Sequence, residues 1–127
     1  MKMRTLGKNA PRVSAIGLGC MRMWNLVGAK SGTDEESIAT IRAALDAGIS
    51  FLNTGDFYGM GHNELLGGQA IKRRRDQAVI SVKFGVLRSP SGQILGIDAR
   101  PNAVKNFAAY SLLRLGVDVI NLPTWSY

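Results

Sequence analysis

The chain has very little cysteine and histidine, and it has no long hydrophobic run. Its 127 residues include one cysteine, Cys20, and one histidine, His62. A single cysteine cannot form an internal disulfide and no zinc-type spacing exists, so we expect no metal site and a reducing compartment, the cytoplasm. No stretch approaches the roughly 20 apolar residues that cross a bilayer, and charges interrupt the N-terminus where a signal peptide is apolar. We therefore expect no membrane partner.

Aromatic residues are also few, at 7% of the chain, although the formal net charge is +7. Residues 72–75, KRRR, form a compact basic run. Proteins that bind single-stranded nucleic acids stack bases on aromatic side chains, and here no aromatic residues alternate with the scattered basic ones. The run instead closes an amphipathic segment, where cations offset the dipole of a helix. We predict no nucleic-acid partner. The positive charge of the chain could also attract the anionic phosphates of a cofactor, and this interpretation stays open.

Short apolar runs alternate with segments of helical spacing along the whole chain. The pattern predicts a hairpin at 4–14, strands at 15–20, 49–53, 78–83 and 117–122, helices at 34–47, 63–75 and 101–115, and a surface loop at 84–98. Strands that alternate with helices are typical of a parallel α/β sheet, so we predict one domain over residues 1–127 with four parallel strands and three helices. An open doubly wound sheet and half of a (β/α)8 barrel both fit this order.

Polar residues follow the predicted buried strands at the edge where α/β folds place their sites. Asn53 ends the second predicted strand, Asp56 and Tyr58 lie in the next loop, and Lys83 ends the third strand. A lysine at the end of an apolar strand is costly unless its ammonium has a partner or faces a cleft. Beside a tyrosine hydroxyl, a lysine cation favours the phenolate, which makes the hydroxyl a better proton donor. We therefore expect Lys83 and Tyr58 to lie side by side.

Four segments of the chain carry a resemblance to a known family. Residues 55–67, GDFYGMGHNELLG, resemble the aldo-keto reductase signature around its catalytic tyrosine, and residues 81–85, SVKFG, resemble the strand that bears its lysine. Residues 13–21 and 110–118 resemble two further family segments. The resemblance implies a TIM barrel, of which this chain would be the N-terminal half, with NADPH as the hydride donor.

The same resemblance implies reduction of a small carbonyl substrate, with Tyr58 as the general acid and Lys83 as its tuning cation. Gly19 and Met21 would lie near the nicotinamide. One departure is Asn53, which stands where the family has an aspartate paired with the lysine. An amide accepts a hydrogen bond but brings no negative charge. A compensating role for Asp56 stays open.

A second departure is at the end of the chain, where Ser126 stands about where the family has a histidine and the second half of the barrel does not follow. We therefore expect a truncated reductase whose activity is weak or lost. The alternative is a non-catalytic, reductase-derived oligomeric scaffold. A half-barrel also has two open edges, at residues 15–20 and 117–122, so we expect a homo-oligomer, most simply a dimer.

Two further residues have open roles. For His62 we favour a position at a helix start over a binding role, because a lone histidine rarely makes a site. Trp24 either lines a substrate pocket or packs a loop, and packing is the commoner role of such a residue. Gly59 and Gly61 lack a third glycine at the dinucleotide-binding spacing and do not directly follow a strand, so a Rossmann site is not expected.

Overall fold

The computed structural model describes residues 1–23 and 32–125 and has one parallel sheet with the strand order β3-β4-β5-β8. Its elements are β1 (Met3–Thr5), β2 (Arg12–Ser14), β3 (Gly17–Gly19), α1 (Asp34–Asp46), β4 (Phe51–Gly55), α2 (His62–Ile71), β5 (Val79–Phe84), β6 (Val86–Arg88), β7 (Ile94–Ile97), α3 (Pro101–Leu115) and β8 (Leu122–Trp125). Strands β1 and β2 form an antiparallel hairpin. The predicted four parallel strands, three helices and small N-terminal hairpin are confirmed.

Helices α1 and α3 are bounded by residues that favour helix ends: a capping threonine, a proline at a first position and a glycine after the last. Thr33 caps α1 through its side chain, which accepts from the Glu36 N–H, while the Glu36 carboxylate accepts from the Thr33 N–H. This reciprocal capping box satisfies two backbone donors at the start of α1. Helix α3 begins at Pro101 and ends before Gly116, whose φ of 65° is the left-handed conformation that favours glycine.

Two predicted boundaries in the first half of the chain are wrong. Strand β4 does not end at Asn53 but continues to Gly55, because Thr54 and Gly55 still pair with β5. Helix α2 ends at Ile71 instead of residue 75, since the chain turns at Arg73 with a φ of 67°. The basic run therefore follows the helix. One of its arginines, Arg75, hydrogen-bonds to a distant part of the chain, since it donates to the Val119 carbonyl at 2.8 Å.

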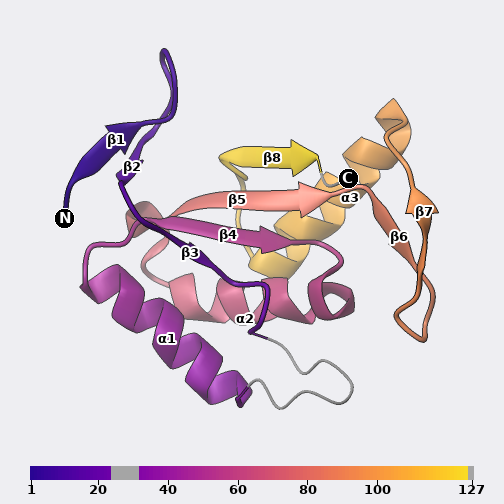
Figure 1. Cartoon of the computed structure of the whole chain (residues 1–127), viewed down its shortest axis with the longest axis horizontal. Coiled ribbons are helices and arrows are strands. Elements are labelled where there is room, and N and C mark those ends of the chain that lie inside the picture. The colour runs from indigo at the N-terminus through magenta and orange to yellow at the C-terminus, as the bar shows by residue number, and fades with distance from the viewer. Residues whose placement is uncertain (24–31, 126–127) are drawn as a thin grey trace.

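The second half of the chain brings two more corrections. Residues 84–98 are not simply a loop, because β6 and β7 pair within them as an antiparallel hairpin. The last strand begins at Leu122 instead of residue 117. Just before it, the Asn121 side chain accepts from the Ile80 backbone N–H at 2.9 Å, so a side chain takes the place of a strand partner there. Figure 1 shows the β6–β7 hairpin at the end of the sheet where β5 finishes, opposite the β1–β2 hairpin.

The core lies between the sheet and the helices. Its buried members are Cys20, Ile41, Leu45, Leu52, Ala70, Ile71, Ala78, Ile80, Val82 and Leu115. Residues on a strand alternate between faces, so Leu52, Ile80 and Val82 turn toward the helices. The intervening residues of β4 and β5 therefore face the other side of the sheet, and the candidate site is on that side. None of the helices among the described residues is long and apolar enough to cross a membrane.

Strands β3 and β8 are the two edges of the four-stranded sheet. Edge strands carry unpaired backbone groups that another chain can pair with, so a homo-oligomer, most simply a dimer, stays our prediction for the 13.7 kDa chain. Sedimentation equilibrium at micromolar concentration measures it, and the expected result is a mass of at least two chains. A folded species that remains at the mass of one chain over the whole concentration range would refute it.

Candidate active site

Three polar residues of β4 and β5 share the sheet face that looks away from the helices. Asn53 pairs with Ser81 and Gly55 pairs with Lys83 in the parallel register, so Asn53, Ser81 and Lys83 lie on one face near the carboxyl ends of the strands. The Lys83 Nζ donates a hydrogen bond to Asn53 Oδ1. The amide therefore takes the place that the sequence assigns to a carboxylate partner.

Tyr58 lies directly after β4, in the short turn that leads to α2. Its side chain is 6% exposed, and Lys83 Nζ lies 5.6 Å from the centre of its ring. A side chain at Gly55 would come within 3.1 Å of the Tyr58 ring, so a glycine there lets the ring lie over the end of the strand. The structure thus brings together Tyr58, Lys83 and Asn53, the three residues that the sequence singled out as catalytic.

Gly19 and Met21 lie at the same edge of the sheet. Gly19 pairs with Asn53 in the β3–β4 register, and the Cys20 N–H donates to the Asn53 carbonyl at 2.8 Å. Apart from its chain neighbours, no atom of the described residues lies within 4 Å of the position that a Cβ on Gly19 would take, and Met21 is 56% exposed. Among the described residues, Gly19 and Met21 thus leave the surface beside Asn53 uncovered.

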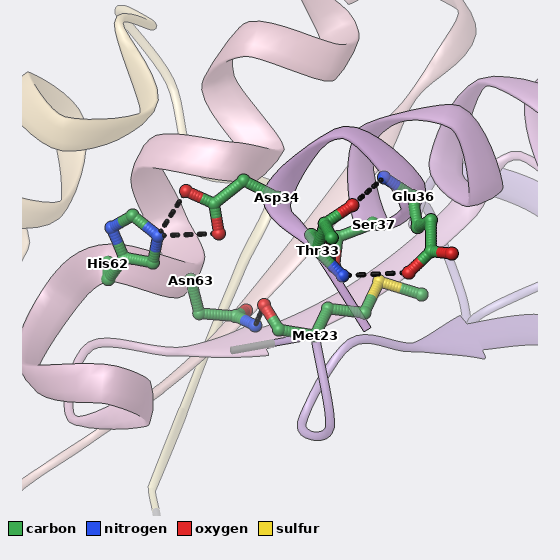
Figure 2. A network of polar contacts seen from close by, with 7 residues as sticks. All are labelled: Met23, Thr33, Asp34, Glu36, Ser37, His62 and Asn63. Atoms are coloured by element: carbon green, nitrogen blue, oxygen red, sulfur yellow. Dashed lines mark hydrogen bonds and ion pairs between the residues drawn. The ribbon is translucent and has the colours of Figure 1, made fainter. Parts of the chain in front are cut away.

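Asn63 is a residue beside the site whose structural role sequence reasoning missed. Its buried side chain accepts from the Thr54 hydroxyl and donates to the Cys20 carbonyl at 2.7 Å and to the Met23 carbonyl at 3.2 Å. It therefore ties the turn that carries Met21 to the start of α2 and to β4. Figure 2 shows Asn63 and Met23 in this network. An asparagine at the second residue of a helix was the available signal, because such side chains are suited to binding backbone groups.

The neighbouring residue, His62, is the first residue of α2, in agreement with the expected position at a helix start. Its Nε2 lies 2.9 Å from both carboxylate oxygens of Asp34, in the first turn of α1. Figure 2 shows this contact beside the Thr33 capping box, so α1 and α2 are joined at their N-terminal ends. In the described part of the chain, no three histidine, cysteine or acidic side chains are grouped to hold a metal ion.

Asp56 does not compensate for the missing carboxylate at position 53. Lys83 bonds to Asn53, whereas the charges that act on Asp56 are those of Glu64 and Arg114. Neither Asp56 oxygen has a hydrogen-bond partner of normal geometry within the described residues. Burial above all, and then the Glu64 charge, raise the pKa of Asp56 to about 7, although Arg114 and the Phe57 backbone amide lower it. Asp56 is thus a buried acid that takes no part in the contact between Lys83 and Asn53.

Asp56 is expected to make the protein less stable as the pH rises. The folded-state pKa of about 7 lies above the usual 3.8, so between these values the folded state keeps a proton that the unfolded state has lost. The contribution of Asp56 to the free energy of unfolding then falls by at most about 1.4 kcal/mol per pH unit within this window and is constant outside it. In Asp56→Asn, the loss between about pH 5 and pH 8 should shrink by about 2 kcal/mol.

Urea denaturation at the two pH values measures this effect. Asp118→Asn, at an exposed position, is the matched control and should keep the slope of the unchanged protein. An equal slope in Asp56→Asn and Asp118→Asn would exclude Asp56 as the source.

Cys20 is a buried core residue, and burial raises the pKa of its thiol to about 12, so it is an unreactive thiol. Trp24 and Ser126, which the sequence analysis also considered, lie outside the described residues.

A parallel sheet with polar residues gathered at the carboxyl ends of its strands is the arrangement of an α/β enzyme. Comparison with known proteins defines the family. A sequence model of the aldo/keto reductase family matches residues 15–124. The chain belongs to the aldo/keto reductase family.

Individual relatives agree with this assignment. The aldo-keto reductase yakc [NADP(+)] of Schizosaccharomyces pombe is 35% identical over 112 residues, which are 87% of this chain and 32% of that protein. The holo form of an aldo-keto reductase from Bacillus halodurans superposes with a TM-score of 0.82 at 31% identity, over 98% of this chain and 40% of that one. An aldo-keto reductase from Klebsiella pneumoniae in complex with NADPH has a TM-score of 0.68 at 26% identity, over 91% of this chain and 36% of that one.

These relatives are TIM barrels, so the four parallel strands and three helices correspond to part of such a barrel, 40% of the chain from Bacillus halodurans. The chain spans about a third of the length of the curated relatives that it matches.

Proposed function

We propose that this chain takes part in NADPH-dependent reduction of a small carbonyl compound, with Tyr58 as the general acid. The observation that carries the proposal is the position of the Lys83 ammonium, 5.6 Å from the centre of the Tyr58 ring at the carboxyl edge of a parallel sheet. A cation at this place stabilises the phenolate that remains when the hydroxyl gives up its proton. The relative from Schizosaccharomyces pombe, whose name includes NADP(+), supports the choice of cofactor.

When bound, NADPH would supply a hydride to the carbonyl carbon. The Tyr58 hydroxyl donates its proton to the carbonyl oxygen, so that hydride and proton together convert the carbonyl to an alcohol. Lys83 then faces a negatively charged phenolate. Gly19 and Met21 offer the open surface on which the nicotinamide would lie.

Asn53 sets the expected level of activity. Its amide holds the Lys83 ammonium by a hydrogen bond but brings no anion to neutralise it. Loss of one member of a coupled catalytic set removes several orders of magnitude in rate in other enzymes. We therefore propose weak turnover, below about 1 per second. The same residue favours the second candidate, a reductase-derived oligomeric scaffold without catalysis.

The two candidates differ in cofactor binding. Titration of NADPH into the protein should change the fluorescence emission of the cofactor, and an aldehyde panel should then cause slow NADPH consumption. Unchanged emission at NADPH concentrations up to the millimolar range, together with no consumption, would refute the reductase proposal and leave the scaffold.

A further inference from the structure

A chain of hydrogen bonds runs from Lys83 across three neighbouring strands. Lys83 Nζ donates to Asn53 Oδ1, and Asn53 Nδ2 donates to Ser81 Oγ at 3.1 Å. Ser81 Oγ lies 3.0 Å from Thr124 Oγ1. Thr124 Oγ1 in turn donates to the Leu122 carbonyl at 3.4 Å. Either hydroxyl can donate in the contact between Ser81 and Thr124, so Thr124 gives Ser81 a second hydroxyl partner while the Ser81 oxygen accepts from Asn53.

The chain solves a problem that an amide creates and a carboxylate does not. A carboxylate accepts hydrogen bonds on both oxygens, so either oxygen can face a lysine. The Asn53 amide has one oxygen and one NH2 group, and in the flipped orientation the NH2 would face the Lys83 ammonium, donor against donor. The ammonium itself favours the orientation that gives it an acceptor, and a group that accepts from the NH2 on the other side of the amide favours that orientation further.

We propose that Ser81 is a positioning residue that fixes the orientation of the Asn53 amide and through it the place of the Lys83 ammonium. Its hydroxyl oxygen accepts the Asn53 NH2 proton on one side, and on the other side the hydroxyl shares a hydrogen bond with the Thr124 hydroxyl. Ser81 is 3% exposed, so bulk water cannot replace its oxygen when the hydroxyl is removed. The role in catalysis rests on the proposed function, whereas the role in holding Lys83 does not.

A purely structural role for Ser81 makes a different prediction. If the serine only fills a small space between strands, Ser81→Ala has the same effect whatever residue stands at position 53. If Ser81 orients an amide, its loss matters in the presence of Asn53 and is nearly harmless after Asn53→Asp, because a carboxylate needs no orientation. The dependence on position 53 is therefore the decisive measurement.

The test compares four proteins: the unchanged chain, Ser81→Ala, Asn53→Asp and the double variant. The readout is the rate at which an amine-reactive ester acylates Lys83, followed by peptide mass spectrometry, with the exposed Lys105 as the internal reference. Loss of a net hydrogen bond between neutral groups, such as that from Asn53 to Ser81, corresponds to about a threefold to tenfold change. We expect Ser81→Ala to raise the Lys83 rate by this factor with Asn53 present and by less than about twofold with aspartate.

Three further variants make the result specific. Ser81→Thr keeps the hydroxyl and should stay near the unchanged rate. Ser111→Ala removes another buried serine hydroxyl, on α3, and should leave Lys83 unaffected. Thr124→Val, at an exposed position, tests the same hydrogen-bond chain if Ser81→Ala does not fold. It should also raise the acylation rate of Lys83, and only with Asn53 present.

An equal effect in both backgrounds would overturn the proposal. Acylation of Lys83 needs neither NADPH nor substrate, so the outcome is separate from that of the reductase proposal. Dependence on position 53 without NADPH consumption would uphold the positioning role and refute catalysis. NADPH consumption without that dependence would do the reverse.

Discussion

Tyr58→Phe is expected to lower the rate of NADPH-dependent carbonyl reduction about 100-fold or more, the usual contribution of a positioned general acid. The substitution removes only the hydroxyl, and the ring can keep its place under the Lys83 ammonium and beside Phe57, whose ring centre is 4.8 Å away. NADPH affinity should therefore change little while turnover falls. A loss of both together would point to a disturbed site and not to a missing proton donor.

The rate of NADPH consumption at saturating aldehyde measures the turnover, and cofactor fluorescence measures the binding. Tyr110→Phe is the matched control, because it makes the same chemical change at a tyrosine on α3 that is 54% exposed. Its turnover should equal that of the unchanged chain. If Tyr58→Phe is as active as Tyr110→Phe, another group supplies the proton and the assignment of Tyr58 is wrong.

The pairing of Tyr58 with Lys83 could be predicted because it depends only on the order of elements. Tyr58 comes after β4 and Lys83 lies near the end of the neighbouring strand β5, and the carboxyl ends of parallel strands meet at one edge. The partners of Asn53 could not be predicted in the same way. Ser81 stands within an apolar run, and its contact with Asn53 depends on the strand register, which the chain sets through many backbone pairs at once.

The errors in the fold have a related cause. Residues 84–98 contain Pro90 and Gly92, which are typical of loops, and the hairpin in them is held by pairing between short segments that have no strong pattern of their own. Residues 117–122 have the apolar character of a strand, but Asn121 uses its side chain to bind the Ile80 N–H, and regular pairing starts only at Leu122. Tertiary contacts decide both cases.

The ion pair between Glu64 and Arg114 was also beyond sequence reasoning, because 50 positions separate its members. Glu64 is fully buried near the start of α2, and its Oε2 accepts from Arg114 Nε on α3. Its other oxygen has no partner among the described residues. A Cβ on Gly61 would lie 2.7 Å from Arg114 Cδ, so the glycine leaves the room that the arginine occupies. Arg114 is thus the cation that balances a buried carboxylate.

Arg114→Met is therefore expected to lower the free energy of unfolding by about 3 kcal/mol, because it leaves Glu64 buried without a counter-charge. Methionine keeps much of the aliphatic length, so the loss measures mainly the charge and its hydrogen bond. Urea denaturation near neutral pH gives the value. Arg100→Met is the control, since the Arg100 side chain that pairs with Asp98 is 83% exposed and its loss should change the stability much less.

The double variant Glu64→Gln, Arg114→Met separates the ion pair from simple packing. If the destabilisation comes from an uncompensated buried charge, neutralising Glu64 should restore a large part of the stability that Arg114→Met removes, because a neutral amide is far less costly to bury than a carboxylate. If the arginine acts by filling space between α2 and α3, the two losses should simply add. Additive losses would therefore show that Arg114 joins the helices by packing and that the charge on Glu64 is balanced in another way.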